Sequence, residues 1–396
     1  NIDYKVHGLE ELKFVLSLGM DYSWGRNYNG VNPGSFQAAG DNENPRIGQY
    51  SISNSVSRNE VLEAYANYNK DFGIHNLDVM AGYSWQHVYN GGQSISYFNE
   101  TDEVKLNPGE SIDTRYPYGA SESYLVSFYS RVNYSLDSRY LFTASIRADG
   151  SSKFSPATRR VIFPSGAFAW NIAEEGFLED ASSLSQLKLR LSAGMTGQQD
   201  GISDYAHLAR YKLSDDVYSV YNMGNYGYQF VYTPQAYDPN IKWETTTTYN
   251  AGIDFGFFKD RLTGSVDAYL RNTNDLLNVV TTPMGSNFGN SLLTNIGSLQ
   301  NKGIEFAVNV IPVQTEDWHL SVGFNVTFQD TKFTKLNATD DPNYYEEVTL
   351  ISKGTGSKLS RHQVGYAPYS YYVLQQIYDH EGNPIQNAFV DQNKDG

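Results

Sequence analysis

The sequence contains no cysteine, which excludes disulfide bonds, thiolate catalysis and zinc sites with cysteine ligands. Basic residues are also few, because 29 Lys and Arg stand against 44 Asp and Glu. The resulting net charge of −15 makes nucleic acid an unfavourable partner, since little would neutralise its phosphates. No uncharged apolar run reaches the ~18 residues of a transmembrane helix. This does not exclude membrane-spanning β-strands, because a polar residue at every second position lowers the mean hydropathy of such strands.

Sequence patterns of common enzymes are lacking as well. The seven histidines are scattered without metal-ligand spacing, and neither a G-x-S-x-G motif nor a phosphate-binding loop occurs. We therefore expect no enzymatic activity and no catalytic residue. The first residues lack the basic and apolar regions of a signal peptide, and the last ones stop within a predicted loop. We expect the chain to be part of a longer protein.

The dominant pattern is a hydrophobic period of two, which is typical of β-strands. One apolar set alternates with polar residues in the segment 318–328 and comprises Trp318, Leu320, Val322, Phe324, Val326 and Phe328. Similar alternation occurs in the segments 12–22, 77–85, 140–148, 187–195, 249–257, 262–270 and 304–310. The sequence predicts about twelve strands and an all-β protein.

Strand length and connection length together favour a transmembrane β-barrel over a sandwich. Strands of ~12 residues span the ~25 Å apolar band of an outer-membrane barrel, whereas sandwich strands are usually shorter. Short predicted connections, at residues 7–10, 71–74, 135–138, 259–260 and 312–317, alternate with long ones, at 25–45, 89–120, 197–242, 276–294 and from 330 onward. Barrels have short periplasmic turns and long extracellular loops. The connection 173–186 is longer than this alternation predicts.

Aromatic residues, 14% of the chain, gather towards the predicted strand ends. Tyr22 with Trp24, Tyr83 with Trp85, and Trp243 are examples. Such positions suit the aromatic girdles at the two membrane interfaces of a barrel. The alternative is that these rings fill the core of a large soluble β-protein.

Several long blocks resemble the barrel of SusC/RagA-type TonB-dependent outer-membrane transporters. They include RVNYSLDSRYLFTASIRADGSSKF at residues 131–154, FPSGAFAWNIAEEGFLED at 163–180 and LKLRLSAGMTGQQDGISDY at 187–205. The segments 241–277 and 295–310 continue the resemblance in the same order. Together these blocks lie across about half of the chain.

The resemblance implies that residues 1–396 are part of one antiparallel barrel domain of 22 strands with a plugged lumen. No plug domain is recognised in this chain, and the final strands are also unmatched. It further implies localisation in the bacterial outer membrane and TonB-dependent import of glycans, oligosaccharides or peptides. The implied partners are a SusD-like surface lipoprotein and, through the missing N-terminal region, the TonB complex.

Polar residues opposite the apolar stripes are expected to face the lumen, where they contact the plug, line a conducting path, or simply solvate a polar interior. The candidates are Arg131, Arg147, Asp149, Arg190, Asp267 and Arg271. Arg147 with Asp149, and Asp267 with Arg271, have the spacing of ion pairs on one face.

The long loops are rich in Tyr, Asn, Gly and Asp, a composition suited to recognition surfaces. Candidate contacts with a ligand or a partner are Tyr221, Tyr226, Tyr228, Tyr232 and Tyr237. Tyrosine faces stack on sugar rings while neighbouring amides and carboxylates bind hydroxyls. Packing within the loops explains the same composition.

The sequence ends with Asp391, Asn393 and Asp395 in a D-x-N-x-D-G pattern, which matches the first half of a calcium loop. The acidic residue of position 12 would lie beyond Gly396. A loop with Asx turns gives the same pattern, so calcium binding remains an open alternative and no cofactor is predicted.

Two other functions fit parts of the pattern. One is a large extracellular β-protein that binds glycans or surfaces without transport, and it would purify without detergent. The other is a passive porin of twelve to fourteen strands, which would lack a plug.

Overall fold

The computed structural model describes residues 1–32, 35–36, 48–99, 112–113, 119–213, 220–224, 228–230, 232–282, 291–337, 341, 343–348 and 358–391. Within these residues, 13 strands form one large sheet, and shorter strands form four small sheets. The chain divides into two compact units. The prediction of an all-β protein is confirmed.

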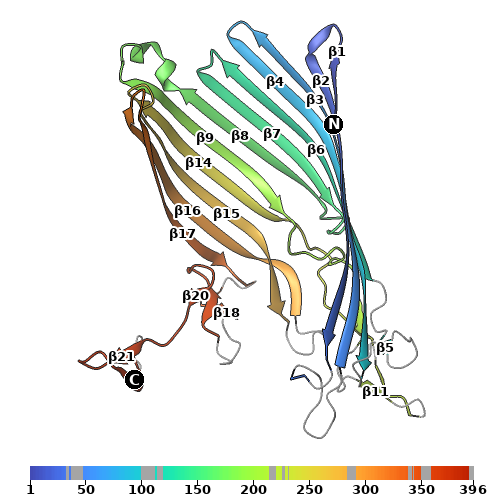
Figure 1. The fold of residues 1–396 in the computed structure, drawn as a ribbon. Helices are drawn as coiled ribbons and strands as arrows, with labels where there is room; N and C mark the ends of the chain where they lie inside the picture. Colours follow the sequence, from blue (N-terminus) through green and yellow to red (C-terminus); the bar gives the residue numbers. More distant parts are fainter. Residues whose placement is uncertain are drawn as a thin grey trace. The chain divides into compact units, whose positions relative to one another are not determined.

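The first unit contains residues 1–166, 199–208 and 238–243. Its strands are hydrogen-bonded in the order in which they occur along the chain (Figure 1). They are β1 (Ile2–Val6), β2 (Leu9–Val31), β3 (Gly48–Phe72), β4 (His75–Asn99), β6 (Gly119–Leu136), β7 (Tyr140–Ser151) and the first part of β8 (Arg160–Asn171), with β5 (Ile112–Asp113) beside β4. The boundary between the units falls within β8, after residue 166.

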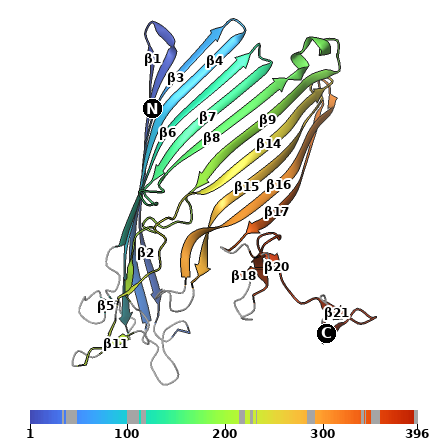
Figure 2. The ribbon, with the colours of Figure 1, turned by 180° about the vertical axis from the view of Figure 1, so that it is seen from behind.

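The second unit contains residues 167–198, 209–237 and 244–396. Figure 2 shows its long strands side by side. They are β9 (Leu184–Gln198), β14 (Glu244–Phe257), β15 (Leu262–Thr281), β16 (Ser291–Gln314) and β17 (His319–Lys335). Two short 3₁₀ helices, η1 (Ile172–Glu174) and η2 (Gly176–Leu178), precede β9.

Four small sheets belong to the connections after β9 and after β17. In the first connection, β10 (Tyr211–Leu213) pairs with β13 (Tyr232–Pro234), and β11 (Val220–Asn222) pairs with β12 (Tyr228–Phe230). The second connection contains a three-stranded sheet, β18 (Tyr345–Val348), β19 (Ser360–Gln363) and β20 (Ser370–Tyr371), and a hairpin, β21 (Gln376–Tyr378) and β22 (Pro384–Phe389).

Short turns join neighbouring strands where the sequence predicts them. Two residues separate β1 from β2 and β3 from β4, and three separate β6 from β7. Gly73 has a φ of 67°, while Asp137 and Ser138 have 52° and 54°. Tight hairpin turns require such positive φ values, because these turns match the right-handed twist of the strands.

Several strands are longer than the ~12 residues expected from the apolar pattern. β3 and β4 have 25 residues each, β16 has 24 and β2 has 23. The expected loops at 25–45, 89–120 and 276–294 therefore begin or end inside strands. The physical reason is that backbone pairing continues through Ser and Asn beyond the apolar stretch, as in Ser51↔Ser96 and Asn54↔Gln93.

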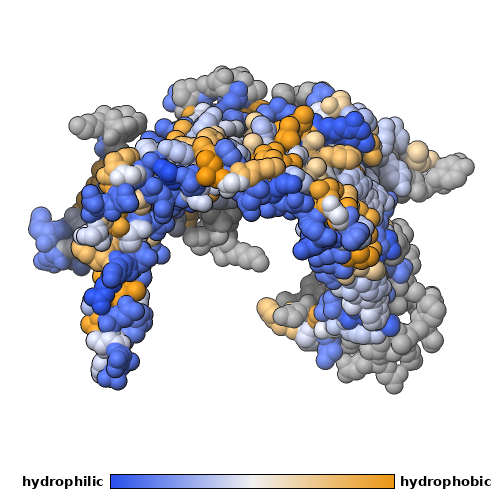
Figure 3. Space-filling model, turned by 90° about the horizontal axis from the view of Figure 1, so that it is seen from above, coloured by the Kyte–Doolittle hydropathy of each residue, from blue (hydrophilic) through white to orange (hydrophobic). Residues whose placement is uncertain are grey.

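One face of the sheet is apolar and exposed. On β2, Leu18 and Met20 are each 66% exposed, and on β17 Phe324 and Phe328 are 59% and 70% exposed. Figure 3 shows apolar residues gathered in patches among hydrophilic ones. Exposed apolar patches of this kind mark contact with a membrane or a partner.

The buried apolar core is small and lies mainly in the first unit. Phe154, Ile202, Ile241 and Trp243 are at most 4% exposed, and we call them the loop-base core. They come from the β7–β8 connection and from the two ends of the long connection between β9 and β14. No helix within the described ranges is long and apolar enough to cross a membrane.

Trp243 is a correction to the expected aromatic girdle. Its ring lies 4.9 Å from that of Phe154, and its Nε1 donates a hydrogen bond to the Arg159 carbonyl at 3.0 Å. The ring therefore anchors a loop instead of facing lipid. Tyr22 and Trp24, by contrast, are 57% and 61% exposed on the apolar face.

Candidate functional site

The polar face of the second unit contains a three-residue ion network. Arg190 on β9 donates two hydrogen bonds to the Asp254 carboxylate on β14, both at 2.8 Å. The same guanidinium donates a 3.0 Å bond to Asp267 on β15. These side chains are 16–34% exposed, so the network is only partly solvated. Bidentate arginine–carboxylate pairs combine fixed geometry with strong charge-assisted bonds.

Gly252 makes this network possible. It lies opposite Arg190 on one side and opposite Asp267 on the other. An added Cβ would lie 2.3 Å from Asp267 Oδ1 and 2.9 Å from Arg190 Nη2. The absence of a side chain on β14 therefore allows charged groups of its two neighbours to meet across it.

The expected pair of Asp267 with Arg271 is replaced by the pair of Asp267 with Arg190. Arg271 instead places its guanidinium 5.9 Å from the centroid of the Tyr269 ring. The cause is strand register, because Asp267 and Arg190 both align with Gly252, whereas Arg271 aligns with Thr248. Sequence spacing along one strand does not contain this information.

A second network lies on the polar face of the first unit. Arg147 donates to Asp149 Oδ1 at 2.7 Å, as the sequence predicts, and to Ser127 Oγ at 2.8 Å. Its guanidinium also lies 5.7 Å from the centroid of the Tyr129 ring, whose hydroxyl donates to Glu63 at 2.6 Å. The network thus joins β3, β6 and β7.

Arg131 belongs to the same polar face but is exposed. It aligns with Met80 on β4 and with Ser145 on β7. Two positions away on β6, Asn133 donates to Asp78 at 3.2 Å. All six predicted polar-face residues therefore lie on long strands of the main sheet, and they occur in two groups, one in each unit.

The predicted tyrosine contacts lie in the connection between β9 and β14. Tyr221 on β11 and Tyr232 on β13 are 64% and 69% exposed, and Tyr237 is 41% exposed. Tyr228 belongs to β12. Tyr226 lies outside the described residues. Exposed tyrosines on short hairpins are available for stacking contacts.

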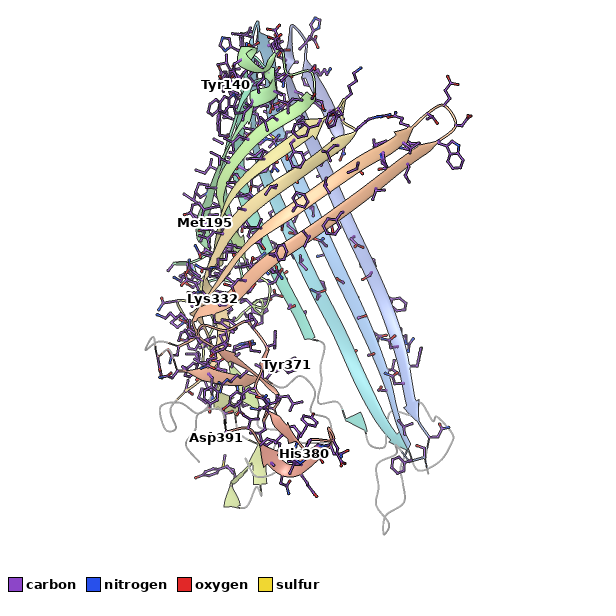
Figure 4. All side chains as sticks on the ribbon, turned by 90° about the vertical axis from the view of Figure 1, so that its left-hand side faces the viewer. Tyr140, Met195, Lys332, Tyr371, His380 and Asp391 are labelled. Atoms are coloured by element: carbon purple, nitrogen blue, oxygen red, sulfur yellow. The ribbon has the colours of Figure 1, made fainter. Side chains whose placement is uncertain are left out.

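Of the predicted calcium ligands, Asp391 is exposed just after the β21–β22 hairpin (Figure 4). Asn393 and Asp395 lie outside the described residues. Among the described residues, no group of three or more His, Asp or Glu side chains is arranged to hold a metal ion.

Sequence reasoning missed two features. One is the loop-base core, whose members are far apart along the chain and have no shared period. The other is the β18–β20 sheet, whose strands of two to four residues are too short to show alternation.

An extended antiparallel sheet with one exposed apolar face and one charged face defines the class of membrane β-barrel proteins. The comparison with known families agrees with this. The family described as "TonB dependent receptor-like, beta-barrel" matches residues 3–393, and the chain belongs to this family. This is a family of outer-membrane transporters and not of enzymes.

The similar proteins place the chain near the SusC/RagA type. The TonB-dependent receptor SusC of Bacteroides thetaiotaomicron is 42% identical over 402 residues, which cover 100% of this chain and 39% of SusC. The TonB-dependent receptor P3 of Formosa agariphila is 38% identical, covering 72% of this chain and 28% of that receptor. The solved RagAB peptide transporter is 25% identical, with a TM-score of 0.77, covering 93% of this chain and 39% of that one. The chain therefore spans less than half the length of these relatives.

Proposed function

We propose that this chain forms part of the barrel of a TonB-dependent importer that carries glycans, oligosaccharides or peptides across the outer membrane. The observation that carries the proposal is the 42% identity to SusC across the whole chain. The peptide alternative is supported by the likeness to RagAB, which is described as a peptide transporter.

We also infer which parts of the longer protein form its barrel and its plug. Residues 1–396 belong to one barrel domain, and the plug and the segment that contacts TonB are contributed by other parts of that protein. A SusD-like surface lipoprotein covers the extracellular loops. The likeness to the RagAB complex supports such a partner.

Within this function, the two polar-face networks contact the plug or line the substrate path. The Arg190 guanidinium is held in place by two carboxylates and that of Arg147 by one, and fixed charges of this kind suit docking of a complementary surface. Tyr221, Tyr232 and Tyr237 contact the substrate or the lipoprotein partner.

The small number of buried apolar residues disfavours the alternative of an extracellular β-protein that binds without transport. Within the described residues, nine hydrophobic residues are buried, whereas large apolar residues of β2 and β17 are exposed. A soluble protein of this size would bury such residues in a core.

Uptake by whole cells tests the proposal. The gene for the full-length protein is deleted from its natural host, and entry of fluorescent oligosaccharides and peptides is measured with and without a proton uncoupler. We expect loss of uptake of at least one probe, restored by the wild-type gene and abolished by the uncoupler. Unchanged uptake of the whole panel, or uptake that resists the uncoupler, would refute TonB-dependent import.

A further inference from the structure

The β18–β20 sheet presents two different faces. Glu346 aligns with His362, and Glu347 aligns with Arg361. Since side chains alternate along a strand, Glu346 and His362 share one face, whereas Tyr345, Glu347 and Arg361 share the other. Figures 1 and 2 both show this sheet beside the end of β17.

The first face is anchored to the long strands. Both Glu346 oxygens accept hydrogen bonds from Asn278 Nδ2 on β15, at 2.9 Å. The His362 ring lies 4.9 Å from the ring of Phe333 on β17, which is 7% exposed. Ser360 is buried at 4% exposure. These contacts make the small sheet a fixed platform for the opposite face.

The opposite face holds Arg361 between two aromatic rings. The guanidinium carbon lies 3.5 Å from the ring centroid of Tyr372 and 5.0 Å from that of Tyr345. These tyrosines are 62% and 49% exposed. Cation–π contacts of this kind fix the plane of a guanidinium while using only its faces.

The guanidinium edge lacks an anionic partner among the described residues. The nearest candidate by register, Glu347, instead pairs with Lys358 at 3.7 Å. Arg361 therefore presents N–H donors in a preorganised plane with no carboxylate of this part of the chain to satisfy them. The arginine in the Arg190 network differs, because two aspartates surround it.

The charged side chains of this sheet balance, because Lys358 and Arg361 stand against Glu346 and Glu347. The two carboxylates are engaged elsewhere, Glu346 with Asn278 on the anchored face and Glu347 with Lys358. An arginine fork matches a carboxylate through two parallel hydrogen bonds. The exposed rings of Tyr345 and Tyr372 beside it supply surface for stacking, whereas Tyr371, labelled in Figure 4, aligns with Ser360 and therefore lies on the other face.

We propose that Arg361, Tyr345 and Tyr372 form a binding subsite for a carboxylate group on the imported ligand. Arg361 binds the carboxylate, and the two rings pack against the adjoining part of the ligand. The carboxylate belongs either to an acidic sugar or to the C-terminus of a peptide. The inference rests on the proposed import function and narrows it to anionic ligands.

Binding to the purified full-length protein, with its lipoprotein partner if the two copurify, tests this subsite. The probes are an oligogalacturonide, the same oligosaccharide with its carboxylates methyl-esterified, a short peptide with a free C-terminus and its amidated form. The variants are Arg361→Gln, Arg361→Lys and Tyr372→Leu. Arg26→Gln is the matched control, because it removes one positive charge from an arginine that also lies over a tyrosine, Tyr28, at 5.0 Å.

We expect Arg361→Gln to weaken binding of one free-acid probe by about tenfold to a hundredfold, the range for a charge-assisted hydrogen bond. The methyl-esterified or amidated form of that probe should bind weakly to the wild-type protein, and Arg361→Gln should change its affinity little. Arg361→Lys should retain part of the affinity, because it keeps the charge but loses the fork. Arg26→Gln should leave binding unchanged. The free-acid probe that responds identifies the source of the carboxylate.

Two results would overturn the subsite without touching the import function. One is equal binding of acid and neutral probes by wild type. The other is equal loss of both forms in Arg361→Gln, which would mean that the stack only stabilises the sheet. Hydrogen exchange of the β18–β20 amides in each variant separates unfolding from lost recognition. Failure of import itself is detected independently by the cell uptake assay with its whole probe panel.

Discussion

Replacing Gly252 by alanine should destabilise the barrel because the new methyl group displaces the Asp267 carboxylate. The Cβ would lie 2.3 Å from Asp267 Oδ1, well inside contact distance. The lost bond to Arg190 costs about 1 kcal/mol, after allowing for side chains that are 34% and 16% exposed. Steric displacement adds about 1 kcal/mol. The expected loss of unfolding free energy is therefore about 2 kcal/mol.

Gly323→Ala is the matched control for this substitution. Gly323 lies on β17, where an added Cβ would meet only Asn309 Oδ1, at an ordinary 3.8 Å. Its replacement should be neutral or slightly stabilising, since alanine reduces the conformational entropy of the unfolded chain by about 0.4–1 kcal/mol. The difference between the two variants isolates the steric and ionic contribution at position 252.

Urea unfolding of the full-length protein in lipid vesicles, followed by tryptophan fluorescence, measures these changes. In an Asp267→Ala background the obstructing carboxylate is gone, so Gly252→Ala should cost less than about 0.5 kcal/mol there. Equal stabilities of Gly252→Ala and Gly323→Ala would refute the reasoning. An unchanged cost in the Asp267→Ala background would refute it as well.

Two further predictions concern the connections. Trp243→Ala should destabilise the loop-base core by about 3–5 kcal/mol, because it removes a large side chain that is 4% exposed. Limited proteolysis should then cleave the connection between β9 and β14 faster than in the wild-type protein. An unchanged cleavage rate would contradict this prediction. Burial lowers the pKa of His362, an effect that Glu346 partly opposes. The unfolded state, with a pKa near 6.5, therefore takes up the proton first, and the β18–β20 sheet should lose stability as pH falls below about 6.5. Hydrogen exchange of its amides at several pH values measures this, and His362→Gln should abolish the dependence.

The period of two carried most of the fold prediction. It identified the strands, their two faces and the short turns, because one apolar side chain per two residues is a local property of a strand that has one apolar environment. The spacing of Arg147 and Asp149 likewise predicted an ion pair that the structure contains.

The sequence could not reveal contacts that depend on register between strands. Asp267 pairs with Arg190, which lies 77 residues away in the chain, only because both align with Gly252. Strand ends were also misjudged, since the backbone ladder of β3 and β4 continues through polar residues. Backbone hydrogen bonding does not need apolar side chains, so hydropathy underestimates strand length.

The sequence by itself therefore determined that the protein forms a sheet with one apolar and one charged face. It also determined the resemblance to SusC-like transporters. Only the tertiary structure decided that Trp243 packs in a loop-base core and that Arg361 lies between two tyrosines. The physical reason is distance along the chain. The alternation of apolar and polar side chains can be recognised from residues that are neighbours in the sequence. The burial of Trp243 and the ring contacts of Arg361 instead depend on segments that meet only after the strands have paired.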